Sequence, residues 1–174
     1  MSLPSLSRLI EELALEPHPE GGFFRRTYVA PVTVPHTALP QGFGGERAVA
    51  SAIFYLLERG GVSRLHRLRS DEMWHHYLGG PLTVVELPAQ PLGAVRETTL
   101  GPDLLAGQRV QHTVAAGTLF GAAMPAEAAE PYALVGCTVH PGFDFAEFEL
   151  AERGALLETY AANSQVRAWI ERLT

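Results

Sequence analysis

Four residues whose side chains bind metals or move protons lie within one short stretch, Gly60 to Gly79. They are His66, Glu72, His75 and His76. Imidazole and carboxylate groups are common ligands of divalent metals, and histidine also transfers protons near neutral pH. The stretch therefore predicts a chemical site, used either for metal binding or for proton transfer.

A second group of candidate residues lies near the N-terminus, in the segment P-H-P-E-G-G (17–22). The prolines stiffen this segment, and the glycines let the backbone turn or approach another part of the chain closely. His18 and Glu20 are presented on this turn. We expect them to close one mouth of the site and to bind its ligand.

Two adjacent strands are predicted to position the central residues. Residues 62–68 alternate in character, so His66 shares a face with Val62, Arg64 and Leu68. Ser70-Asp71 forms a turn, and the next strand begins at Glu72. This strand–turn–strand unit would bring His66 and Glu72 close together.

The order of the two neighbouring histidines leaves one alternative open. Strict alternation along 72–78 places Glu72, Trp74 and His76 on one face of the strand and His75 on the other. A bulge or twist in the strand would instead bring His75 toward Glu72. Trp74 is expected to be a core residue.

Composition limits the classes of function. The chain has 174 residues, which fits a single domain (1–174), and its net charge is -6 without any basic run. Phosphate binding needs clustered cations, so nucleic acid is not expected as a partner. All 13 basic residues are arginine, which excludes chemistry through a lysine Schiff base.

The rest of the composition indicates a cytoplasmic protein. Cys137 is the only cysteine, so no disulfide forms within the chain, as is usual in a reducing compartment. No apolar run approaches the roughly 20 residues of a membrane helix. The N-terminus has no basic segment followed by an apolar one, so we expect neither a signal peptide nor membrane association.

The remaining pattern predicts an all-β domain with short helices at both ends. Apolar residues at helical spacing predict a helix over about 4–14, and a second helical region follows residue 145 with a cap at Ser164. Residues 30–47 contain several Pro and Gly and predict a long loop of the kind that often covers a site. Short strands are predicted at 23–29, 48–57, 62–68, 72–78, 82–87, 95–100, 109–114, 118–123 and 132–139. Such a series is typical of an antiparallel barrel or jelly roll.

The central stretch resembles the first motif of the cupin superfamily. That motif is Gly, five residues, His-x-His, three or four residues, Glu, six residues and Gly, and Gly60, His66, Glu72 and Gly79 match its spacing. Leu68 stands where the second histidine is usual. The second cupin motif resembles A-A-G-T-L-F (115–120), with alanine for its proline and phenylalanine for its histidine. Two of the four usual metal ligands are therefore missing.

The resemblance is closer to a small branch of single-domain cupins of unknown function. The segments that carry it are P-H-P-E-G-G (17–22), H-R-L-R-S-D-E-M-W-H (66–75), V-A-A-G-T-L-F (114–120) and P-G-F-D-F-A-E-F (141–148). The chain departs from the branch at Arg26, where an acidic residue is usual, and at Ala115. The resemblance implies a jelly-roll barrel, a homodimer and likeness in fold to sugar-nucleotide epimerases. It favours His75 over His76 as a site residue, and it marks Gln111 as a polar position that orients a ligand.

Three hypotheses of function follow. In the first, the protein binds a small polar ligand, sugar-like or a hydroxy acid, and works as an isomerase or epimerase with His66 and Glu72 as the proton-transfer residues. No cofactor is required in that case. In the second, His66, Glu72 and one of His75 or His76, with His75 favoured, hold a divalent metal weakly, as in a dioxygenase or hydrolase. In the third, the protein binds a small molecule without catalysis.

Overall fold

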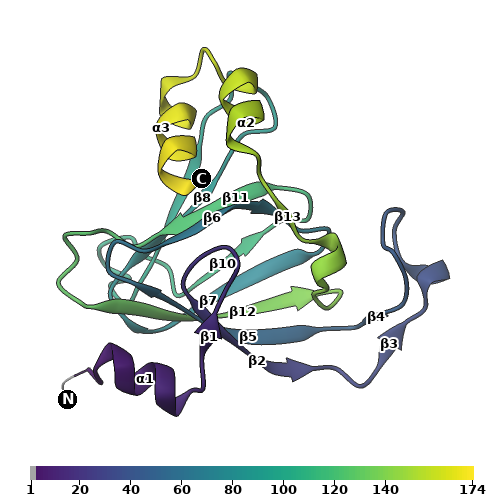
Figure 1. The fold of residues 1–174 in the computed structure, drawn as a ribbon, viewed down its shortest axis with the longest axis horizontal. Coiled ribbons are helices and arrows are strands. Elements are labelled where there is room, and N and C mark those ends of the chain that lie inside the picture. The colour runs from purple at the N-terminus through teal and green to yellow at the C-terminus, as the bar shows by residue number, and fades with distance from the viewer. Residues whose placement is uncertain (1–2) are drawn as a thin grey trace.

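The computed structural model describes residues 3–174 and contains two antiparallel sheets that pack face to face (Figure 1). The sheets remain separate, so the fold is a jelly roll and not a closed barrel, which refines the expected architecture. The helix and strand types follow the predicted order, with helices at both ends of the chain. No helix among residues 3–174 combines the length and hydrophobicity that crossing a bilayer requires.

The first sheet has six strands in the order β1-β2-β5-β12-β7-β10. Most of its strands pair antiparallel with partners distant in sequence, as a jelly roll requires. Its strands are β1 (Glu16–Pro17), β2 (Phe23–Val29), β5 (Ser51–Glu58), β7 (Asp71–Gly79), β10 (Gln111–Val114) and β12 (Tyr132–His140).

The second sheet has five strands in the order β13-β6-β11-β8-β9. A separate pair, β3 and β4, forms an arm that extends away from the two sheets (Figure 1). The strands of the second sheet and the arm are β3 (Thr33–Val34), β4 (Arg47–Ala48), β6 (Val62–Arg67), β8 (Leu82–Glu86), β9 (Arg96–Leu100), β11 (Leu119–Ala123) and β13 (Glu149–Leu150).

Helices pack on part of the outer face of each sheet. Leu9 of α1 packs with Leu56 and Leu134 on the outside of the first sheet, while Val166 and Ile170 of α3 pack with the second sheet. The helices are α1 (Leu6–Glu12), α2 (Arg153–Thr159) and α3 (Ser164–Leu173), with 3-10 turns at His36–Ala38 and Phe145–Glu147. Burial of apolar side chains on both faces makes each sheet a stable platform for residues between them.

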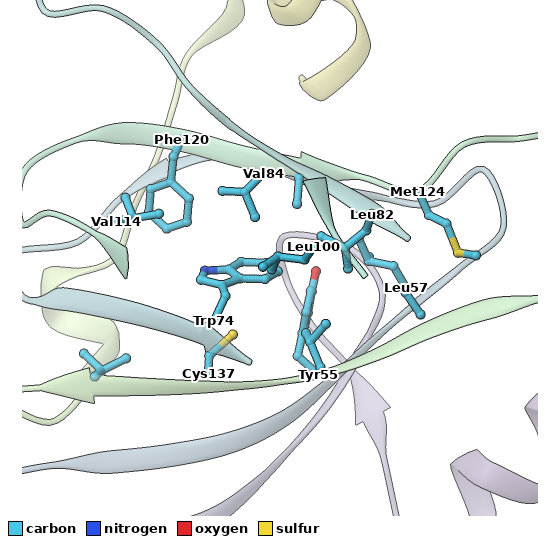
Figure 2. Close-up of a cluster of buried hydrophobic side chains, with 14 of the residues drawn as sticks. Tyr55, Leu57, Trp74, Leu82, Val84, Leu100, Val114, Phe120, Met124 and Cys137 are labelled. Carbon is cyan, nitrogen blue, oxygen red and sulfur yellow. The ribbon is translucent and has the colours of Figure 1, made fainter. Parts of the chain in front are cut away.

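The main core lies between the two sheets around Trp74, which is 1% exposed. Figure 2 shows its ring with Phe120 and Val114 on one side and Cys137 and Tyr55 on the other. Trp74 lies on β7, whose alternation turns Glu72 toward the same interior. The prediction that Trp74 is a core residue agrees with this position, and the core continues directly into the candidate site.

The loop 30–47 is fastened to the segment that follows β12. Arg47 and Glu147 form an ion pair through two contacts, Nη2 to Oε1 and Nε to Oε2, the second at 3.3 Å. Their side chains are only 9% and 7% exposed. Glu147 also accepts a hydrogen bond from the backbone N–H of Gly44 at 3.0 Å. This buried pair holds two surface segments together beside the candidate site.

Candidate functional site

A small cavity of about 30 Å³ lies at the inner face of the first sheet, close to the start of β7. A volume of this size holds roughly two water molecules. The expected site residues His18, Glu20, His66 and Glu72 all line it. The complete lining is His18, Glu20, Phe24, Arg26, Ser51, Ile53, Tyr55, His66, Leu68, Glu72, Cys137, Val139, Phe143 and Phe148.

His66 enters the cavity from β6 and is 2% exposed. A bulge in β6 opposite Gly121 changes the alternation of that strand, so Ser63 and His66 both point inward although they are three residues apart. The ring nitrogen Nδ1 lies 2.7 Å from the carbonyl oxygen of Arg64, to which it donates as N–H. Nε2 is therefore the lone-pair nitrogen of the neutral ring, free to accept a proton.

Glu72 enters the cavity from β7 and is 7% exposed. The indole N–H of Trp74 donates to its Oε2 at 2.9 Å. Burial raises the pKa of Glu72 to about 7, while the neighbouring His66 opposes this shift. Glu72 is thus near its titration midpoint at neutral pH, which is the condition for an efficient general acid or base.

The Pro17–Gly22 turn places Glu20 inside the cavity, close to both histidines. Glu20 Oε1 accepts a hydrogen bond from the hydroxyl of Ser63 at 2.8 Å, and Oε2 lies 3.4 Å from His66 Nδ1 and 3.6 Å from His18 Nδ1. Burial raises the pKa of Glu20. The turn fits because Gly22 has φ +65° and a Cβ there would lie 2.5 Å from the Leu56 carbonyl oxygen.

The two histidines of the cavity are kept neutral by their surroundings. Burial lowers the pKa of His66, and Glu72 opposes the shift. Burial also lowers the pKa of His18, whose ring lies 4.5 Å from Phe24 between centroids. The cavity therefore combines neutral imidazoles with carboxyl groups whose pKa values are raised, an arrangement suited to proton transfer.

The structure corrects the expected position of His75. Its side chain lies on the outer face of the first sheet, where Nε2 is 3.1 Å from Thr138 Oγ1 and Nδ1 is 2.9 Å from the side-chain amide of Gln111. Neither His75 nor Gln111 lines the cavity. A bulge in β7 does occur, but it lies at Tyr77, beyond both histidines, so His75 keeps the orientation that strict alternation gives it. His76 does not line the cavity either; its Nε2 lies 3.1 Å from the Gly80 carbonyl oxygen.

Apolar side chains occupy the two positions where the cupin motifs usually have further histidines. Leu68 lines the cavity, and Phe120 packs on His66 with 4.2 Å between ring centroids. Within residues 3–174, no group of three or more His, Cys, Asp or Glu side chains is arranged to hold a metal ion. With His75 on the outer face, the set His66, Glu72 and His75 does not converge on one point.

Two residues that contact the site, Ser63 beside the cavity and Tyr55 in its lining, carried little or no signal in the sequence. Ser63 faces inward only because of the bulge in β6, and Tyr55 lies within an apolar run, where it donates a 2.8 Å hydrogen bond to the Gly21 carbonyl oxygen. A second buried pair, His112 with Glu86 at 2.8 Å, was also missed. It lies outside the cavity.

Two side chains separate the cavity from a larger open groove. Leu68 and Phe148 line both the cavity and a groove of about 610 Å³. The groove also contains the exposed residues Arg67 and Arg69. Displacement of Phe148 would join the two spaces and enlarge the volume open to a ligand.

We expect the pH dependence of stability to report on Glu72. Its folded-state pKa of about 7 exceeds the ordinary value of 4.5, so between these values the folded protein holds a proton that the unfolded chain releases. The contribution of Glu72 to the free energy of unfolding therefore decreases by about 3 kcal/mol as the pH rises through this window. Urea unfolding of wild type and Glu72→Gln at pH 4.5 and at about pH 8 measures the change.

The lowered pKa values of His18 and His66 act in the opposite direction, since the unfolded chain then binds the extra protons. These histidines are present in both proteins, so the difference between wild type and variant isolates Glu72. The difference in free energy of unfolding, wild type minus Glu72→Gln, should be smaller at about pH 8 than at pH 4.5. A difference that stays constant would show that the carboxyl group titrates normally.

The comparisons with known proteins agree with this fold. The family model described as Cupin superfamily (DUF985) matches residues 7–151. A crystal structure of a Shewanella oneidensis protein shares 38% identity and a TM-score of 0.82, over 99% of this chain and 98% of that one. A hypothetical protein from Leishmania major shares 30% identity and a TM-score of 0.86, over 98% of this chain and 99% of that one.

More distant structures share the fold alone. A cupin 2 domain-containing protein from Halorhodospira halophila has 14% identity and a TM-score of 0.55, over 88% of this chain and 85% of that one. A comparison with curated proteins gave no match. The match to the family model over most of the sequence, together with full-length likeness to the two closer structures, shows that the chain belongs to the cupin superfamily, in the family described as DUF985.

Proposed function

We propose that the protein binds a small polar molecule in the cavity and transfers a proton on it, as an isomerase or epimerase does. The observation that supports this most directly is the pairing of His66, which is neutral, with Glu72, whose pKa is about 7, in one buried cavity. Burial lowers the pKa of His66, which keeps the ring neutral and able to accept a proton, and it raises the pKa of Glu72 so that the carboxyl group still carries a proton to donate.

The chemistry follows from the protonation states. His66 Nε2 accepts a proton from a carbon next to a carbonyl or carboxyl group of the ligand. Protonated Glu72 donates a proton, to the opposite face of that carbon in an epimerisation or to a neighbouring atom in an isomerisation. The step leaves an imidazolium beside a carboxylate, and their mutual attraction stabilises this state.

The other two polar residues would support this pair. Glu20 lies 3.4 Å from His66 Nδ1 and so stabilises the ring when it becomes charged. His18, on the same turn, supplies a further polar contact for the ligand. The size of the cavity favours a ligand of two or three carbons, such as a hydroxy acid, over a sugar ring unless the Leu68–Phe148 wall moves.

Solvent exchange tests this proposal directly. The protein is incubated in D₂O with a panel of short 2-hydroxy acids and small sugars, and NMR follows deuterium incorporation at carbon. We expect exchange with at least one short hydroxy acid. Binding of the panel without exchange of any member would contradict catalysis and support the alternative of a ligand-binding module.

We also expect the working unit to be a homodimer. Only Phe23 and Phe24 of β2 pair with β1, so within residues 3–174 the remainder of β2 is an open sheet edge. Tyr28 and Val29 on this edge are 52% and 49% exposed. Pairing with a second copy would provide hydrogen-bond partners for the backbone groups of this edge and bury these side chains.

Light scattering at micromolar concentration measures the oligomeric state. A mass of about twice 18.9 kDa is expected. The variant Tyr28→Glu, which places a charge on the edge, should shift the mass toward the monomer. A wild-type mass of one chain would contradict the dimer.

A further inference from the structure

Arg26 occupies the mouth of the cavity, on the inner face of the first sheet. It pairs across the sheet with Ile53, and both residues line the cavity. Phe24, two residues earlier on β2, lines it as well. Arg25 lies between them on the other face, where its guanidinium donates to the Leu13 carbonyl oxygen at 3.0 Å.

Within the part of the chain that the structure describes, Arg26 has no ion-pair partner, in contrast to Arg47. Arg47 is paired with Glu147, and Arg64 donates to the carbonyl oxygen of Pro19. Among residues 3–174, no carboxylate lies within ion-pair distance of Arg26, although Glu20 and Glu72 line the same cavity. A guanidinium presents a planar fork of donors that matches a carboxylate, so its free charge at the mouth favours an anionic group there.

The interior of the cavity does not supply a competing cation. Its other titratable groups are His18, Glu20, Tyr55, His66, Glu72 and Cys137. Burial favours the neutral form of each: it lowers the pKa of both histidines and raises the pKa of the four acidic groups. A negatively charged ligand group is therefore attracted to the mouth, and the uncharged part of the ligand fits the interior.

We infer that Arg26 binds the carboxylate of the ligand and so restricts the substrates to small organic acids, with the neighbouring carbon directed toward His66 and Glu72. This inference rests on the proposed function, because it names the substrate class of the same site. Because the carboxylate would lie at the mouth, only the remainder of a two- or three-carbon acid has to fit the cavity of about 30 Å³.

Matched pairs of acids and amides test the assignment. Glycolate and lactate carry a negative charge, whereas glycolamide and lactamide have almost the same shape without one. NMR titration measures the affinity of each for wild type, Arg26→Gln and Arg26→Lys. The variant Arg25→Gln serves as control, since it removes the same charge one residue away on the opposite face.

We expect wild type and Arg25→Gln to prefer the acids over the amides. Arg26→Gln should weaken binding of the acids roughly 10-fold to 100-fold and leave the amides unchanged. Arg26→Lys should retain part of the affinity, because it keeps the charge but loses the fork. Equal affinity for acid and amide, or acid binding that is unaffected by Arg26→Gln, would overturn the inference, as would a failure of all four probes to bind.

The same samples separate this inference from the proposed catalysis. Acid binding that depends on Arg26, without deuterium exchange at carbon, would support the carboxylate site and contradict proton transfer. Exchange that proceeds equally on the amides and in Arg26→Gln would support proton transfer and contradict the carboxylate site.

Discussion

Glu72→Gln is expected to lower the rate of deuterium exchange on the ligand by roughly 10²-fold to 10⁴-fold, the usual contribution of a general acid–base residue. Glutamine keeps the shape of the side chain and still accepts the hydrogen bond that Trp74 donates. Glutamine cannot donate a proton at neutral pH, so the reaction would lack the general acid that acts together with His66. Exchange measured by NMR at saturating ligand isolates this chemical effect from binding.

Glu86→Gln provides a matched control for that experiment. Glu86 is also a buried carboxyl group next to a histidine, 2.8 Å from His112 Nε2, but it does not line the cavity. Exchange in this variant should equal that of wild type. If both variants lost activity equally, the loss would reflect general damage to the fold, and the role of Glu72 as the acid would be contradicted.

Arg47→Ala is expected to lower the free energy of unfolding by about 3–5 kcal/mol, which is typical when one member of a buried ion pair is left alone. The Glu147 carboxyl group, which is 7% exposed, would then be left with only the Gly44 N–H as a donor. For a chain of this size the loss corresponds to a decrease of roughly 6 to 20 °C in Tm. Thermal and urea unfolding followed by circular dichroism measure both quantities.

The exposed pair Arg8–Glu12 supplies the control for this prediction. Its side chains are 73% and 67% exposed and 3.7 Å apart, so Arg8→Ala should change stability by no more than about 0.5 kcal/mol. The double variant Arg47→Met with Glu147→Leu removes both charges and should recover much of the loss. An Arg47→Ala protein as stable as Arg8→Ala would mean that the pair contributes nothing.

The sequence contained enough local information to predict the strands that carry His66 and Glu72. The strand predicted at 23–29 matches β2, and those at 62–68 and 72–78 match β6 and β7 within a residue or so at each end. Period-2 alternation and turn residues are local signals, so they can be read without knowledge of the tertiary contacts of the chain. The position of Trp74 beside Glu72 followed from the same alternation.

Long-range relations could not be predicted in the same way. The bulge in β6 that turns Ser63 inward depends on its pairing with β11, which lies far away in sequence. The choice between His75 and His76 stayed open in the sequence: the resemblance favours His75, whereas strict alternation places His75 on the outer face, where the structure has it. Glu20 contacts Ser63 and His66 only in the tertiary fold, so the spacing of these residues in the sequence could not predict the contacts.

The wall formed by Leu68 and Phe148 has a consequence for how the protein would respond to change at a distance. Both side chains line the cavity and the groove, and Phe148 directly follows Glu147, the residue that Arg47 holds in place. Loosening the Arg47–Glu147 pair would let water into the cavity. Hydration would reduce the desolvation that raises the pKa of Glu72. The raised pKa of Glu72 thus depends on a contact outside the cavity, so in the proposed reaction a substitution at position 47 would shift the pH range of proton transfer without altering any residue that lines the cavity.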